Sequence, residues 1–178
     1  MFYLRRKVGC EMTIWILQVL VSLIFFAQKA FILAGKKAGW LVGVVAAVLA
    51  IFYFYLLGLY VYTVLELGLV VLMGWGFFKT SENPRVETLI RLTTAVVMIF
   101  LAALAFGGLL TIVELMSSIG MLSGTYYLTH KRVRLGWGIS VGAHLLAWWV
   151  GISKEQQIFA DFQLASAIVC LVGAMKRE

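Results

Sequence analysis

The chain has 178 residues, of which 63% are apolar and 13% charged, and its formal net charge is +7. A soluble domain normally carries about a quarter charged residues and under half apolar ones, so this composition excludes an ordinary soluble protein. Several apolar runs exceed about 18 residues, which predicts an all-α integral membrane protein with helical spans. Basic residues flank these runs, which favours contact with the lipid bilayer over binding of nucleic acid.

The sequence predicts about seven transmembrane helices in chain order. Only a tight, uncharged turn separates the second from the third, whereas a polar loop from Lys79 to Arg91 precedes the fourth. That loop holds the only proline, Pro84. The predicted spans are Thr13–Leu33, Gly39–Leu57, Gly58–Phe78, Leu92–Leu110, Ile112–Leu128, Leu135–Ile152 and Ile158–Met175.

The basic residues predict the orientation of these helices. Most fall on one side of the bilayer, and cytoplasmic loops are enriched in lysine and arginine. We therefore expect an outside N-terminus and a cytoplasmic C-terminus in a bacterial inner (plasma) membrane, although Arg5, Arg6 and Lys7 oppose this orientation. The residues assigned to the cytoplasmic side are Lys29, Lys36, Lys37, Lys79, Arg85, Arg91, Lys131, Arg132, Arg134, Lys176 and Arg177.

An internal repeat organises the chain. Residues 37–81 align without a gap on residues 134–178, a Gly-Trp pair opens each unit and a Gly-x-x-Lys motif closes it. The first and fifth spans align one residue out of phase, with Ser22 opposite Ser118 and Gln18 opposite Glu114. We predict a single membrane domain, 1–178, with parallel three-helix units at 11–79 and 111–178 and a linker at 80–110, a 3+1+3 arrangement typical of transporters.

The second unit carries several motifs of a known family. Glu114 opens its first helix, Tyr126-Tyr127 close that helix, a basic loop leads to Gly136-Trp137, and Gln163 precedes an apolar stretch to Gly173. This pattern resembles one half of the PnuC-type nicotinamide riboside transporters, which are SWEET-like carriers of three-helix repeats. The resemblance implies that the chain carries a nucleoside or vitamin, which is phosphorylated inside the cell.

Glu66 is the only charge in the third predicted span, and the alignment places it opposite Gln163. A charge at the bilayer centre costs at least roughly 2.5 kcal/mol, so it requires a partner or a cavity. With Tyr62 one helical turn away, Glu66 fits a substrate-hydroxyl or proton-coupling site. Alternatively it is a buried acid that holds two helices in register.

Three residues of the last two spans are further candidates for substrate binding. The amide of Gln163 suits ribose hydroxyls or a carboxamide, although glutamine also links helices. His144 is either a coupling group or a neutral imidazole bonded to a backbone carbonyl. Trp148 lies deep enough in its span to stack on a flat ring.

Glu114 and Ser118 share a face near the start of the fifth span and are the remaining candidates for substrate binding. The resemblance supports Glu114 in that role; alternatively this acid lies in the helix interface. The sequence contains no P-loop, HExxH or GxSxG motif, and Cys10 and Cys170 lack ligand spacing. We therefore expect no enzyme activity, metal or cofactor.

The leading interpretation is a facilitator of a small polar molecule that works by alternating access between the two units. Nicotinamide riboside is the expected substrate, and the arrangement allows a homo-oligomer. The alternative is a structural or assembly membrane protein whose buried acid joins helices.

Overall fold

The computed structural model describes residues 2–78, 84–106 and 111–176. Those residues form helices joined by short turns and contain no strand, as the all-α prediction requires. The helices are α1 (Phe2–Leu33), α2 (Ala38–Leu56), α3 (Tyr60–Phe78), α4 (Pro84–Phe106), α5 (Ile112–Thr129), α6 (Val133–Ser153) and α7 (Gln157–Met175).

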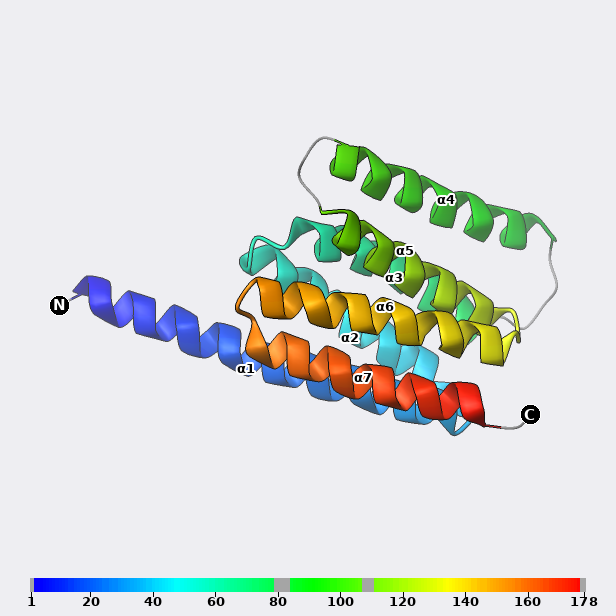
Figure 1. Ribbon diagram of the computed structural model, residues 1–178, viewed down its shortest axis with the longest axis horizontal. Helices are drawn as coiled ribbons and strands as arrows, with labels where there is room; N and C mark the ends of the chain where they lie inside the picture. Colours follow the sequence, from blue (N-terminus) through cyan, green and yellow to red (C-terminus); the bar gives the residue numbers. More distant parts are fainter. Residues whose placement is uncertain (1, 79–83, 107–110, 177–178) are drawn as a thin grey trace.

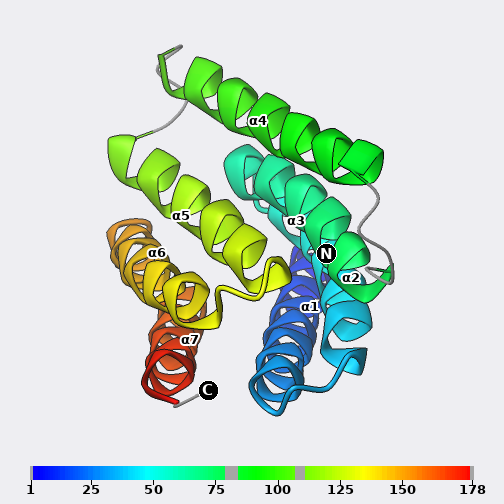
Figure 2. The ribbon, with the colours of Figure 1, turned by 90° about the vertical axis from the view of Figure 1, so that its right-hand side faces the viewer.

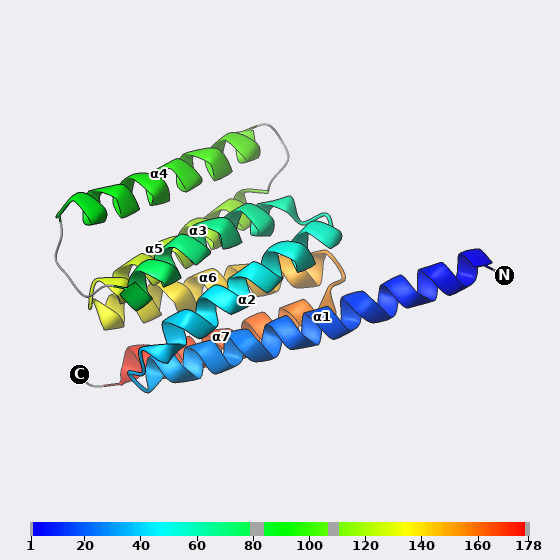
Figure 3. The same cartoon turned by 180° about the vertical axis from the view of Figure 1, so that it is seen from behind.

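The start of two helices differs from the prediction. Helix α1 begins at Phe2 rather than Thr13, and its first turns extend beyond the other helices (Figures 1 and 3). No proline interrupts this segment, so the helix continues past the apolar run that the prediction used as its boundary. Helix α4 begins at Pro84, because proline is well suited to the first turn of a helix. The predicted end of the fourth span, Leu110, lies outside the described residues.

Five of the described helices are long and apolar enough to cross a bilayer: residues Ile14–Leu33 of α1, and all of α2, α3, α6 and α7. Large apolar side chains such as Phe52, Ile99 and Ile168 are 61%, 68% and 58% exposed, as expected for a surface that faces lipid. Helices α4 and α5, which correspond to the fourth and fifth predicted spans, are not among the five. Both contain more polar residues than α2, α3, α6 or α7.

Neighbouring helices in the chain pack side by side. Helix α2 contacts α1 and α3, and α6 contacts α5 and α7. Contacts of α1 with α7 and of α3 with α5 join these two sets, which face each other in the end-on view of Figure 2. Helix α4 lies at the periphery against α3 and α5 (Figure 1).

Four helix ends have the same turn. Gly35, Gly58, Lys131 and Glu155 are the described residues with positive φ, between 57° and 71°. In each turn this residue donates its N–H to the carbonyl three residues back, and the next residue donates to the carbonyl five residues back. This is the Schellman motif, whose left-handed residue is usually glycine. The positions fall into two pairs that the alignment matches, Gly35 with Lys131 and Gly58 with Glu155.

The matched turns after α2 and α6 make a direct test of backbone strain. A Cβ on Gly58 would meet nothing within 4 Å, so only the left-handed backbone disfavours a side chain there. We expect Gly58→Ala to lower the free energy of unfolding by about 1 kcal/mol, and Glu155→Gly to raise it by a similar amount. Reversible unfolding in detergent measures both changes. Equal signs for the two variants would contradict the shared turn.

A tryptophan lies over a glycine in both halves of the chain. A Cβ on Gly76 of α3 would lie 2.5 Å from the ring of Trp40 on α2, and one on Gly173 of α7 would lie 2.6 Å from the ring of Trp137 on α6. These distances leave no room for a side chain. The alignment pairs both the two tryptophans and the two glycines, so equivalent residues make the same interhelical contact.

Candidate functional site

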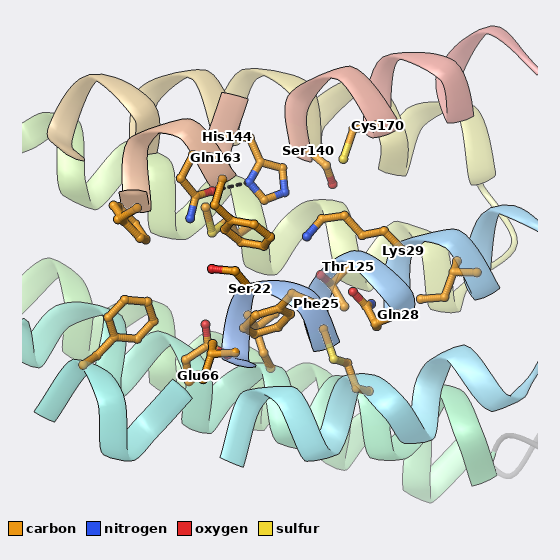
Figure 4. A pocket seen from close by; sticks show the side chains of 18 of the residues that line it. Ser22, Phe25, Gln28, Lys29, Glu66, Thr125, Ser140, His144, Gln163 and Cys170 are labelled. Carbon is orange, nitrogen blue, oxygen red and sulfur yellow. Dashed lines mark hydrogen bonds between the residues drawn. The ribbon is translucent and has the colours of Figure 1, made fainter. Parts of the chain in front are cut away.

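A cavity lies between the two sets of helices, with walls from α1, α2, α3, α5, α6 and α7 (Figure 4). The cavity has a volume of about 80 Å³, counted as the space that the centre of a water molecule can occupy. One water molecule needs about 10–15 Å³ by the same measure, so several waters or a small organic molecule can fit. Charged, amide, hydroxyl and imidazole side chains on its wall are Gln18, Ser22, Gln28, Lys29, Tyr53, Glu66, Thr125, Ser140, His144 and Gln163.

Glu66 lies on the α3 wall of this cavity, where the sequence predicted a site residue. Its side chain is buried, and Oε2 has no hydrogen-bond partner among the described residues. An unsatisfied buried carboxylate oxygen costs free energy in the folded protein. A ligand hydroxyl, amide or cationic group at this wall would supply the partner that the carboxyl group lacks.

Among the described residues, Lys29 is the other charged residue of the cavity wall, and the sequence does not predict it there. The sequence assigns Lys29 to the basic residues on the cytoplasmic side, but the structure places it inside α1 with 7% exposure. Its Nζ lies 5.4 Å from the ring centre of Phe25 and 5.2 Å from that of Phe162. The available signal was its position four residues before Leu33, within the apolar run.

His144 and Gln163 meet at the cavity wall formed by α6 and α7. His144 Nδ1 lies 2.6 Å from Gln163 Oε1, so the imidazole N–H donates to the amide oxygen. The neutral ring then keeps Nε2 as an acceptor, and the amide of Gln163 keeps its N–H donors. The structure thus brings together two predicted site residues that are 19 positions apart in the chain. The partner of His144 is a side chain and not the backbone carbonyl considered above.

Four predicted site residues do not line the cavity: Tyr62, Ser118, Trp148 and Glu114. The ring of Tyr62 packs against Phe54 and Phe159, with ring centres 5.3 and 5.5 Å away. Ser118 is fully buried in α5, and Trp148 is only partly buried. A spacing of four residues places two side chains on one face of a helix but does not determine which neighbouring helix each of them contacts. The spacing of Tyr62 from Glu66 and of Trp148 from His144 is therefore not enough to predict a place on the cavity wall.

Glu114 also lies away from the cavity, at the start of α5. Thr111 and Glu114 form a capping box, in which the Thr111 hydroxyl accepts from the Glu114 N–H and the carboxylate accepts from the Thr111 N–H. The second carboxylate oxygen forms an ion pair with Lys154, at the end of α6. These contacts satisfy the carboxylate and tie two helix ends together.

The cavity is chemically asymmetric between the aligned halves. The alignment of the third and seventh spans places Glu66 opposite Gln163. The alignment of the first and fifth spans, which pairs Ser22 with Ser118, places Lys29 opposite Thr125. All four side chains line the cavity. The charged member of each pair therefore comes from α1 or α3, and the neutral member from α5 or α7.

Metal ligands do not gather at the cavity, since no group of three His, Cys, Asp or Glu side chains suited to a metal occurs among the described residues. Comparison with protein-family models, curated proteins and solved structures gives no match for this chain. The case for a function therefore rests on the side chains of the cavity and on their geometry.

Proposed function

We propose that the protein is a membrane carrier that binds a small polar molecule in the cavity between α1–α3 and α5–α7. The observation that carries this proposal is the partnerless carboxylate oxygen of Glu66 on the wall of a polar cavity. Ligand sites are concave and present a few polar groups on an apolar wall. In a membrane protein, such a buried ionisable group is first of all a functional candidate.

The carrier would work by alternating access between two parallel three-helix units, with α4 as the linker in a 3+1+3 arrangement. Equivalent turns and equivalent tryptophan–glycine contacts support two similarly built units. The cavity lies at their interface, where repeat-built transporters bind their substrates. Rocking of one unit against the other exposes the cavity to each side of a bacterial inner membrane in turn.

Nicotinamide riboside is the first substrate to test, because the sequence resembles the PnuC-type carriers. Gln163 offers donors to ribose hydroxyls or the carboxamide, and Glu66 faces the cationic ring or a hydroxyl. Phe25 and Phe162, rather than Trp148, provide flat surfaces within the cavity. Phosphorylation of the nucleoside inside the cell would lower its internal concentration and so produce net uptake.

A structural role for the buried acid is the alternative. An acid that joined helices would be expected to bond to a side chain or backbone group of another helix. The free Oε2 of Glu66 favours the carrier over this alternative.

Uptake of labelled nicotinamide riboside into proteoliposomes tests the proposal, with thiamine and riboflavin as comparison substrates. We expect saturable uptake by the wild type and a reduction of about tenfold in Gln163→Ala, the effect of one lost hydrogen bond of about 1.4 kcal/mol. Gln157→Ala is the matched control on the same helix, because Gln157 is exposed and bonds Asp161 outside the cavity.

Two outcomes would contradict the proposal. If folded wild-type protein takes up none of the three compounds faster than protein-free liposomes do, the expected substrate class is wrong. Normal uptake by Gln163→Ala would remove that side chain from the site.

A further inference from the structure

Among the described residues, the cavity wall carries one basic and one acidic side chain, Lys29 and Glu66, and no other lysine, arginine, aspartate or glutamate. Both are more than nine-tenths buried, with 7% and 5% exposure. No carboxylate in the described part of the chain lies within 4.0 Å of Lys29 Nζ. The two groups therefore line one space without forming a direct ion pair.

Contacts within the protein leave both groups under-satisfied. Removing an ion from water is costly even after relaxation of the protein. The two phenylalanine rings beside Lys29 offset only part of that cost through cation–π attraction. Glu66 keeps an oxygen without a hydrogen bond in the described structure. A ligand with complementary charges would supply what both groups lack.

The charge of the ligand follows from this pair. A ligand that is only cationic would pair with Glu66 and leave Lys29 without a counter-ion. A ligand that is only anionic would do the reverse. A neutral ligand would offer a counter-charge to neither group. A molecule with one acidic and one cationic group satisfies both, because oppositely charged partners form the strongest hydrogen bonds.

The geometry supports two separate contacts. Figure 4 shows Glu66 at one side of the space, Gln163 and His144 at the other, and the side chain of Lys29 entering between them. We propose that the ligand of this cavity is a small zwitterion, whose acidic group binds Lys29 and whose cationic group binds Glu66. This inference rests on the proposed carrier function, and it favours a zwitterion over the cationic nicotinamide riboside as the substrate of that carrier.

Binding of two matched ligand pairs to the full chain in nanodiscs tests the inference by calorimetry. Nicotinic acid riboside differs from nicotinamide riboside in a carboxylate for a carboxamide, and tryptophan differs from its amide in the same way. We expect the carboxylate member of at least one pair to bind about tenfold or more tightly than its amide, as a charge-assisted hydrogen bond implies.

Lysine variants assign the preference to Lys29. Lys29→Met should abolish it while amide binding persists, and Lys29→Arg should retain it. Lys36→Met is the matched control, since Lys36 also lies over a phenylalanine but is exposed and outside the cavity. A thermal midpoint near that of the wild type confirms that each variant is folded. Undiminished preference in folded Lys29→Met would overturn the role of Lys29.

The carrier function and the zwitterion can fail separately. Uptake of an amide together with equal or weaker binding of its acid would leave the carrier standing and overturn the zwitterion. Preferential binding of an acid without uptake of any probe would support the zwitterion and overturn the carrier. Folded wild-type protein that binds no member of either pair would overturn both.

Discussion

Replacing Glu66 with glutamine should lower uptake of the transported substrate by about ten- to hundredfold without loss of stability. The amide has nearly the same shape but cannot make charge-assisted hydrogen bonds, which contribute about 1.5–3 kcal/mol. An amide costs less to bury than a carboxylate, so the thermal midpoint should not fall. Initial uptake rates and thermal unfolding of the same preparation measure the two effects.

The same variant separates a carrier from a structural protein. If Glu66 held helices together, Glu66→Gln would lower the thermal midpoint, and any loss of uptake would follow from unfolding. Glu155→Gln is the matched control, because Glu155 is exposed at the turn after α6. Uptake that stayed at the wild-type rate in Glu66→Gln would exclude Glu66 from the transport site.

Adding a single methyl group at Gly76 or Gly173 should destabilise the protein by about 1–3 kcal/mol, the usual cost of overpacking. The new Cβ would lie 2.5–2.6 Å from a tryptophan ring in both cases. We expect the larger effect for Gly173→Ala, because Trp137 is 3% exposed whereas Trp40 is only partly buried and can shift. Unfolding in detergent gives both free energies.

Gly74→Ala is the control for this pair. Gly74 lies two residues before Gly76 on α3, and a Cβ there would meet nothing within 4 Å. Alanine should be neutral or stabilising at that position, since it is the better helix former. Equal destabilisation by Gly74→Ala and Gly76→Ala would show that the ring contact is not the cause.

Part of the site could be predicted because the bilayer makes polar residues conspicuous. Glu66 and Gln163 interrupt apolar runs at aligned positions, and both line the cavity together with His144. Lys29 was missed because a lysine near the end of a run is normally a flanking residue. Its burial depends on α7, which brings Phe162 beside it from the other end of the chain. No local pattern contains that contact.

The fold was predictable to a similar degree. Apolar runs locate most helices well, since burial in lipid requires a minimum length. They do not show where a helix stops in water, so the start of α1 at Phe2 followed no hydrophobic signal. Helix ends depend on the backbone conformation of the turn that follows. Glu155 adopts a left-handed conformation there, which a glutamate in the sequence does not predict.

The opposite charges of Lys29 and Glu66 have a consequence for energetics. A membrane voltage of 100 mV performs work of about 2.3 kcal/mol on each elementary charge that crosses it. When a lysine and a glutamate in one cavity change sides together, their contributions cancel. A bound zwitterion adds nothing to that sum. Such a carrier would be electrically silent, and the concentration gradient of its substrate alone would set the direction of transport.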